Sequence, residues 1–578
     1  MRLVKIAFFA STLLFLGALF FHKISEFDQD LGRHLLMGKM IWQQGEVPKA
    51  NLLSYTYPNF EFVNSHWLSE AIFYQVVNFF NSVQSLLYLK TIILVASFGL
   101  TVYTAYRFSR SLAATAFSLA IFVPILLERT EIRPEIFSYL FVAIFLYVLL
   151  LDKKRLFWLL PIIEVVWVNA HIYFIVGPIL LAIFSWNRKD RWPMALLVWL
   201  TTLLNPNGLA GATYPIHVFD NYGYTIVENQ NIFFLREMVF NPNIFYFGVA
   251  FILFAVSFIM TDWKKVTVIT LGLASLAFLP VMAIRSFPFF FLLELPVVAY
   301  NLAHLNPRAR NFLDRQLGNL RPVVPQLIVA LVIFVNLIRC LRLVSNDYYL
   351  TIDSTKRFGA EVQESGKGAL DFIQQNGLHG PIFNNFDIGS YIAYRLYPQE
   401  KVFVDGRPEA YPAAFFQNLY IPMQQSAENF EKVDAVYKFK VIIFAHTDAT
   451  PWGQQFLSFI IKDPKYQLVY LDDYALVFVN RDAFPQAAKN FAVTPQALIS
   501  NDQADYSGRN FLSLAQVAST FGWNDGAIKF LQRAYALNPG SPQVLQAIGM
   551  AYSQNQTMVI LGQKYLADYH DKTRLILF

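Results

Sequence analysis

The sequence predicts a polytopic α-helical membrane domain, followed by an α/β domain and a short tail of helical repeats. The 578 residues are 55% hydrophobic and only 15% charged, and they include 56 phenylalanines. Soluble domains carry about 25% charged residues. Apolar runs recur over the first 342 positions, and most have a length that crosses a bilayer. After Arg342, short β-rich runs alternate with helical ones.

The apolar runs are candidate membrane spans. They cover 4–21, 85–106, 111–127, 134–151, 156–184, 192–204, 244–261, 266–283, 287–303 and 322–342. The first run has no small-x-small cleavage site behind it, so we expect it to be an uncleaved span. The others follow with basic loops between several of them, and basic loops favour the cytoplasmic side.

The run 156–184 decides the topology. All the basic loops are cytoplasmic only if this run crosses twice or enters and leaves on the same face, for example as two half-helices that meet at Asn169 and His171. The chain then has about eleven membrane segments, with its N-terminus inside and its C-terminus outside. A single long tilted span, with one neighbouring span miscounted, is the alternative.

Two long loops are then on the outer side, 23–84 and 205–243. The first contains an amphipathic stretch, 67–77, which suits the membrane surface.

The sequence divides into a membrane domain, 1–346, an α/β domain, 347–485, and a helical tail, 486–578. The α/β domain is expected to have a mainly parallel sheet with a helix over 368–376. Its predicted strands are 381–383, 401–404, 441–444, 467–471 and 476–479. The tail shows a 34-residue period typical of tetratricopeptide repeats, with a plain helical hairpin as the alternative. Because a lone repeat pair is seldom stable, we expect the tail to pack on the α/β domain.

Composition excludes several classes of protein. Cys340 is the single cysteine, so the chain has no internal disulfide and no cysteine zinc cluster. The net charge of +6 lies mainly between apolar runs, which is a topology signal and gives no reason to expect nucleic acid. The sequence has no P-loop, dinucleotide-binding glycine fingerprint or nucleophile elbow.

Asp28 and Asp30 open the first outer loop, where the membrane meets water. A carboxylate at this position can take a proton from an attacking hydroxyl group. Asp30 and His34 are one helical turn apart, so a helix would place both on one face, able to bind a divalent cation such as Mg²⁺ or Mn²⁺. The alternative is a solvated, turn-forming start of the loop.

Several motifs occur together in the first 300 residues, at 27–34, 45–56, 63–70, 133–138, 167–171 and 204–208. They include an Asp-x-Asp…His opening, an Asn-x-x-Ser-Tyr-Thr middle and a His-x-Trp-Leu-Ser-Glu end. In these motifs the sequence resembles the GT-C class of polytopic glycosyltransferases, and in particular its bacterial members. The resemblance implies an integral protein of the bacterial inner membrane that transfers a sugar from a polyprenyl-phosphate carrier on the outer side. In that class an acidic residue of the first outer loop is the base, which here corresponds to Asp30 or Asp28. Donor and acceptor do not carry over.

Further polar residues are candidates for substrate binding. Arg129, Arg133 and Glu135 lie in the outer turn between the third and fourth spans. A guanidinium pairs well with phosphate, so Arg133 is expected to hold the lipid phosphate. An ion-paired hydrophilic loop is the alternative. Arg285 ends an apolar run and is either a second phosphate contact or a snorkelling anchor.

Asn169 and His171 interrupt an apolar run, where polar residues are costly and often functional. A hydrogen bond between helices is the alternative for both. His66, Trp67 and Glu70 are expected to face the sugar, although Trp67 also suits a membrane interface.

Two turns at strand ends complete the candidates, 384–391 and 405–409. Open α/β sheets bind ligands at such ends. The alternatives are a helix cap by Asp387 and a tight turn at Asp405 and Gly406.

The leading hypothesis is an inverting hexosyl- or pentosyltransferase with a lipid, glycan or protein acceptor. Its main rival is a non-catalytic membrane scaffold that recruits envelope partners through the α/β domain and the helical tail. A transporter built on the broken run 156–184 is a third hypothesis, weakened because no second broken run stands at a matching position.

Overall fold

The computed structural model describes residues 2–24, 27, 30–127, 129–218, 220, 222–226, 229–234, 242–351, 356–496, 506–554 and 557–577. Asp28, one of the two predicted carboxylates, lies outside the described residues.

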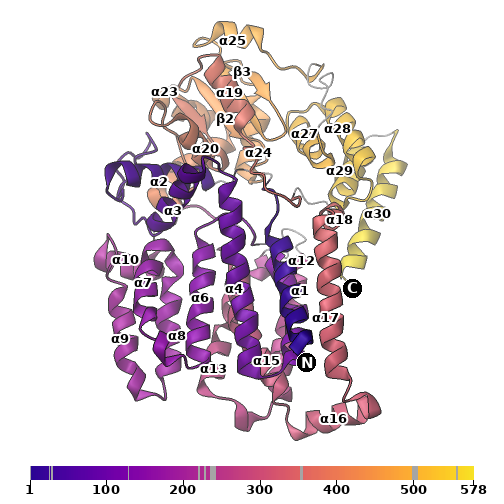
Figure 1. Cartoon of the computed structure of the whole chain (residues 1–578). Helices are drawn as coiled ribbons and strands as arrows, with labels where there is room; N and C mark the ends of the chain where they lie inside the picture. The colour runs from indigo at the N-terminus through magenta and orange to yellow at the C-terminus, as the bar shows by residue number, and fades with distance from the viewer. Residues whose placement is uncertain are drawn as a thin grey trace.

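Helices form the membrane part (Figure 1). Among the described residues, five segments are long and apolar enough to cross a membrane; they contain α1 (Arg2–Phe20), α4 (Ser85–Ser109), α12 (Pro242–Met260), α15 (Phe287–Ala303) and α17 (Val324–Val344). Shorter apolar helices stand between them: α5 (Leu112–Phe122), α6 (Glu135–Leu150), α7 (Leu159–Ala170), α8 (Val176–Ser185), α9 (Trp192–Thr201), α13 (Val268–Ala274) and α14 (Leu279–Met282). The helices coincide with the predicted apolar runs. The total number of crossings stays a prediction.

The predicted break in the run 156–184 is present. Helix α7 ends at Ala170, and His171 has an extended backbone (φ −164°, ψ 144°) before the short turn η3 (Ile172–Ile175) and α8. Arg191 donates a 2.6 Å hydrogen bond to Asp152, which joins the loop after the run to the loop before it. The run therefore enters and leaves on one side.

Basic loops gather at the end of the molecule opposite the α/β domain (Figure 1). Helix α16 (Pro307–Leu317), with Arg308, Arg310 and Arg315, lies there with the N-terminus. The turn that carries Lys264 and Lys265 is beside it, since Asp262 N donates to His304 O at 2.7 Å.

The first outer loop forms two helices, α2 (Leu31–Gln44) and α3 (Trp67–Phe80). The amphipathic stretch predicted at 67–77 is thus helical. Gly38 lets the two helices approach closely, because a Cβ there would lie 2.1 Å from the backbone oxygen of Glu70. The second outer loop contains α10 (Gly208–His217).

A four-stranded sheet forms the core of the α/β domain, with strand order β1-β2-β4-β3. Its strands are β1 (Ile382–Asn384), β2 (Val441–Ala445), β3 (Tyr466–Leu471) and β4 (Ala475–Asn480). Its helices are α18 (Asp347–Thr351), α19 (Lys367–Gln375), α20 (Phe386–Leu396), α21 (Ala413–Phe415), α22 (Ile421–Gln425), α23 (Ala427–Tyr437), α24 (Pro451–Ile460) and α25 (Pro485–Asn490).

Two details of this domain were predicted wrongly, and one alternative is also excluded. Only β1 and β2 are parallel, because the short connection between β3 and β4 allows only an antiparallel pair. The expected strand 401–404 is irregular. The backbone N–H and C=O of Val402 form hydrogen bonds with Leu53 and Tyr55 of the first outer loop, so they are not available to the sheet. Asp387 lies in the first turn of α20, whose cap residue is Asn385.

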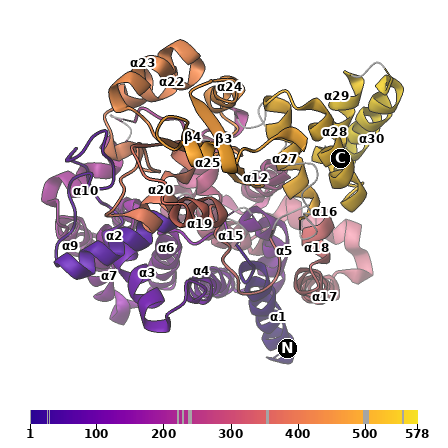
Figure 2. The ribbon, with the colours of Figure 1, turned by 90° about the horizontal axis from the view of Figure 1, so that it is seen from above.

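The helical tail consists of two hairpins, α27 (Gly508–Thr520) with α28 (Asn524–Leu537), and α29 (Pro542–Ser553) with α30 (Val559–Leu577). Their first helices start at 508 and 542, 34 residues apart, as the period requires. The tail packs at the side of the α/β domain (Figure 2), where Thr520 donates to Gln454 at 2.9 Å. Its assignment as a tetratricopeptide repeat stays a prediction.

The arrangement of basic loops makes the topology testable. An alkaline phosphatase fused after residue 577 should be active and a fluorescent protein fused there should be dark, because basic loops stay in the cytoplasm. Fusions at Gly318, beyond α16, are the matched control and should show the reverse pattern. An inactive phosphatase at the C-terminus with an active one at Gly318 would contradict the orientation.

Candidate functional site

Glu70 stands at the centre of a buried polar cluster formed by α2 and α3. Its side chain is 0% exposed. Arg33 Nη1 donates to Oε1 at 3.1 Å, and His34 Nδ1 is 3.0 Å from the same oxygen. Asn64 Nδ2 donates to Oε2 at 2.7 Å. Burial would raise the pKa of Glu70, but the hydrogen bond from His34 and the charge of Arg33 lower it. Glu70 is therefore an anion that holds α2 against α3.

His34 is fixed as a neutral ring by its two neighbours. Burial and the charge of Arg33 lower its pKa. With Nδ1–H donating to Glu70, Nε2 is an acceptor, and Arg33 Nη2 lies 3.3 Å from it. Both ring nitrogens are thus in use.

Asp30 stands at the solvent side of this cluster, just before α2. Arg33 Nη2 donates to its Oδ1 at 3.1 Å, and Arg133 Nη1 is 3.9 Å from Oδ2. Burial would raise the pKa of Asp30, but the charges of Arg33 and Arg133 lower it to about 2. Asp30 is therefore ionised at neutral pH, and a pKa this far below the working pH makes it a weak base.

The predicted cation site between Asp30 and His34 does not fit this arrangement. The Arg33 guanidinium lies between the two side chains, and it uses the lone pair of His34 Nε2. Among the described residues, no group of three metal-ligating side chains is present.

A second group of charges comes from the membrane part. Glu135, at the start of α6, lies 3.8 Å from Arg129 Nη1 and 3.8 Å from Arg285 Nη2. These ion pairs are longer than hydrogen bonds. Arg133 and Arg285 are 19% and 25% exposed, whereas Arg129 is 3% exposed. The two exposed guanidinium groups can thus meet a ligand from the outer side.

Together these residues form what we call the outer cluster. Its cations are Arg33, Arg129, Arg133 and Arg285, and its anions are Asp30, Glu70 and Glu135. The outer cluster has one more positive than negative charge, which suits a singly charged phosphate diester.

The broken helix is bound directly to the start of α3. Trp67 Nε1 donates to Asn169 Oδ1 at 2.8 Å, and Ser69 Oγ donates to Ala170 O at 2.6 Å. Asn169 also donates to the backbone oxygen of Leu204 at 2.9 Å. Hydrogen bonds from α3 and to the loop at Leu204 thus provide partners for the polar groups at the break. Non-helical backbone within a membrane requires such partners.

His171 is oriented by a hydrogen-bond chain. Trp167 Nε1 donates to Ser138 Oγ at 2.8 Å, which leaves the Ser138 hydroxyl hydrogen for His171 Nδ1 at 2.9 Å. Its ring continues a row of rings through the site, with centroid distances of 6.0 Å from His34 to His66, 5.2 Å from His66 to His171 and 4.7 Å from His171 to Tyr173. Arg285 lies over the Tyr173 ring at 5.6 Å.

The structure thus brings the predicted site residues that it describes into one connected set. Sequence reasoning did not find Asn64, Ser138 or Tyr173. Asn64 lies within the motif 63–70 and Ser138 within the motif 133–138, so the positions of both were usable signals, whereas Tyr173 lies outside the motifs. Glu131, in the same turn as Arg129 and Arg133, pairs with Lys356 at 2.9 Å and attaches the turn to the chain entering the α/β domain.

The α/β domain covers the outer cluster through its turn η10 (Pro408–Ala410). Arg407 is buried. It donates hydrogen bonds of 2.8 and 2.7 Å to the two carboxylate oxygens of Asp405, and one of 2.9 Å to Asn51 Oδ1. Asn51 in turn donates to Ala410 O at 3.1 Å. The strand-end turn 405–409 is therefore held against the first outer loop.

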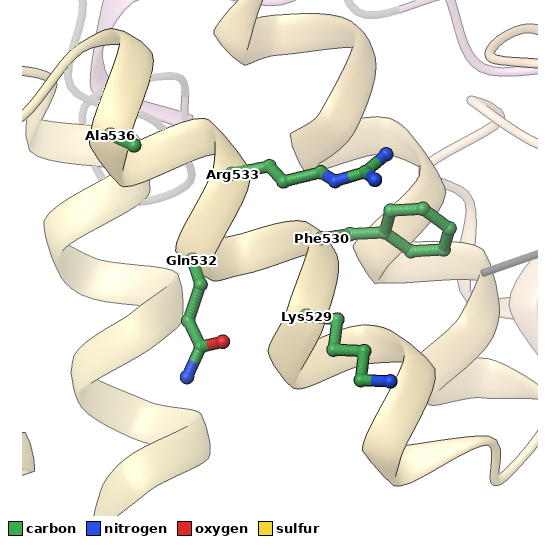
Figure 3. Close-up of a pocket in the computed structure, with 5 residues that line it drawn as sticks. All are labelled: Lys529, Phe530, Gln532, Arg533 and Ala536. Atoms are coloured by element: carbon green, nitrogen blue, oxygen red, sulfur yellow. The ribbon is translucent and has the colours of Figure 1, made fainter. Parts of the chain in front are cut away.

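A shallow pocket of about 290 Å³ lies elsewhere, on α28 (Figure 3). It is lined by Lys529, Phe530, Gln532, Arg533 and Ala536. Lys529 and Arg533 point to the same side as Phe530. The pocket is away from the outer cluster, and a protein partner there stays a prediction.

Comparison with known proteins places the fold. No family model matches the chain. No curated protein matches it either. The solved structure of the archaeal oligosaccharyltransferase AglB from Archaeoglobus fulgidus, in complex with an inhibitory peptide and a dolichol-phosphate, is similar with a TM-score of 0.55 at 12% identity. The match covers 96% of this chain and 86% of that chain. The likeness shows that the two chains share a fold over most of their length.

The buried position of Glu70 gives a stability prediction. Glu70→Gln should lower the free energy of unfolding by about 3–5 kcal/mol, because it leaves the Arg33 guanidinium buried with a weaker partner. Thermal unfolding in detergent, followed by tryptophan fluorescence, measures the effect. Glu46→Gln, at an exposed position of the same loop, is the matched control and should unfold like the unmodified protein. Equal unfolding temperatures for both variants would contradict the central place given to Glu70.

Proposed function

We propose that the protein is a membrane glycosyltransferase that moves a sugar from a polyprenyl-phosphate-linked donor to an acceptor on the outer side of a bacterial inner membrane. The observation that carries this proposal is the outer cluster itself. Arginines and carboxylates from four separate segments meet beside a broken helix, in a fold shared with an oligosaccharyltransferase.

Arg133 and Arg285 are the proposed contacts of the donor phosphate. Both are partly exposed, and their ion pairs with Asp30 and Glu135, at 3.8–3.9 Å, are long enough for a charged phosphate oxygen to compete for the guanidinium groups. The surplus positive charge of the outer cluster would compensate the phosphate in the bound donor. The rings of His66, His171 and Tyr173 would lie along the sugar, and Trp67 would hold the broken helix in place.

The reaction is proposed as a single displacement that inverts the anomeric carbon. The acceptor oxygen forms the new bond to that carbon, and the bond from carbon to phosphate oxygen breaks with its electron pair on the phosphate. Asp30 would accept a hydrogen bond from a second polar group of the acceptor and so orient the attacking hydroxyl, whose proton passes to a carboxylate of the site as the new bond forms. A divalent cation, if required, would have to bind Asp30 on the side away from Arg33.

The same site distinguishes the proposed enzyme from its two rivals, a scaffold and a transporter. A scaffold that recruits partners through the α/β domain or the helical tail has no use for Asp30 and Arg133. A transporter would need the broken helix to move, whereas Ser69 and Trp67 bind the end of α7 at the break. The hydrogen-bonded break therefore favours a fixed site.

Asp30→Asn keeps the shape of the side chain but removes its charge. We expect donor turnover to fall about 10²–10⁴-fold, because the acceptor loses the carboxylate that orients its hydroxyl group for proton transfer. The assay follows the loss of radiolabelled polyprenyl-phosphate hexoses and pentoses in native membranes, with protein level measured in parallel.

Asp220→Asn is the control for this assay, since Asp220 is exposed in the second outer loop and should not affect turnover. Near-normal turnover in the double variant Asp28→Asn, Asp30→Asn would favour the scaffold over the enzyme.

A further inference from the structure

The turn η10 brings a further carboxylate, Glu409, to the outer cluster. Its neighbours in sequence on both sides are anchored on the first outer loop, Arg407 through Asn51 Oδ1 at 2.9 Å and Ala410 through Asn51 Nδ2 at 3.1 Å. The Arg407 guanidinium also lies over the Phe62 ring at 5.0 Å. The position of Glu409 is therefore as fixed as that of the loop that carries Asp30 and Glu70.

The electrostatic surroundings of Glu409 include groups of two other segments, the start of α2 and the second outer loop. The charged and titratable groups that it interacts with are Asp30 and Arg33 around the start of α2, Arg407 on its own turn, and Tyr214 and Tyr222 of the second outer loop. Burial raises the pKa of Glu409, the charges of Arg33 and Arg407 oppose this, and the charge of Asp30 adds to it.

Glu409 also differs from the other carboxylates in its contacts. Glu70, Asp30 and Asp405 each accept hydrogen bonds from arginine. Glu409 is partly exposed, and within the described part of the chain no side chain donates a hydrogen bond to it. Beside it, Arg33 Nε and Arg407 Nη1 are buried without a hydrogen-bond partner among the described residues. Buried polar groups left in this way are typical of ligand sites.

We propose that Glu409 is a catalytic carboxylate supplied by the α/β domain, which takes the proton of the acceptor hydroxyl that Asp30 orients. This proposal rests on the proposed function. The acceptor O–H bond breaks and its proton moves to a Glu409 oxygen, while the acceptor oxygen bonds to the anomeric carbon. The electron pair of the broken carbon–oxygen bond stays on the departing polyprenyl phosphate.

The different roles of Asp30 and Glu409 follow from their different surroundings. Asp30 is held by two guanidinium groups, so it stays ionised and releases any proton at once. Within the described part of the chain, no guanidinium group donates a hydrogen bond to Glu409. Glu409 therefore retains a proton more readily than Asp30 does, as a general base must. The α/β domain would then be part of the active site in addition to covering it.

The test uses the full chain in native membranes, which contain the acceptor, with radiolabelled polyprenyl-phosphate hexoses and pentoses as probes. Glu409→Gln should lower kcat at least about 10²-fold with the donor KM within twofold of the original. The acidic fall of the rate, present in the unmodified protein because Glu409 must be deprotonated, should disappear. Glu409→Asp should restore part of kcat together with the acidic fall.

Glu428→Gln is the matched control, because Glu428 is an exposed carboxylate of the same domain and is paired with Lys432. An unchanged kcat and pH profile in Glu409→Gln would overturn the role of Glu409 alone. No turnover of any donor by the unmodified protein would overturn the proposed function instead. Should Glu409→Gln fail to accumulate, Glu409→Asp decides: a reduced kcat with the acidic fall kept supports the proposal, and an unchanged kcat overturns it.

Discussion

A buried carboxylate cannot remain charged without partners, and the architecture of the outer side follows from this constraint on Glu70. Its two oxygens are satisfied by Arg33, His34 and Asn64, which come from α2 and from the segment before α3. A buried anion left without these partners would cost several kcal/mol. The constraint therefore fixes α2 against α3. It also directs the second terminal nitrogen of Arg33, Nη2, at Asp30.

From this point the interactions spread into both halves of the molecule. Asp30 reaches Arg133 of the membrane part, and α3 binds the broken helix through Trp67 and Ser69. On the other side, Asn51 of the same loop binds Arg407 across 356 positions of sequence. The first outer loop is thus the common partner of the membrane helices and the α/β domain, and displacing it would separate the groups that we assign to donor and acceptor.

The membrane helices, the break in the run 156–184 and several strands could be predicted from the sequence, because each depends on residues close together in the chain. Apolar runs of bilayer length identify their own helices, and the polar pair Asn169 and His171 marked the break because polar groups are costly there. The strands around Ile382 and Val441 were recognisable from β-branched and aromatic residues.

What could not be predicted depends on contacts between distant segments. Val402 stands in a run with strand composition, but its backbone pairs with the first outer loop, so the expected strand did not form. The guanidinium of Arg33 occupies the place of the cation expected between Asp30 and His34; the spacing of three residues allows either partner for Asp30 and does not decide between them. Glu409 appeared in the sequence only as part of a turn, because its approach to Asp30 requires the whole α/β domain to be docked.

The central claim is that the outer cluster binds the phosphate of a polyprenyl-linked sugar, and the position of that phosphate tests it most directly. Electron cryo-microscopy of the full chain in lipid nanodiscs, with a non-hydrolysable polyprenyl-phosphonate sugar, would show it. The account predicts phosphonate density in contact with Arg133 and Arg285, with the sugar between His171 and Asp30. Well-ordered density for the phosphonate at any other position, with the outer cluster free of ligand, would contradict it.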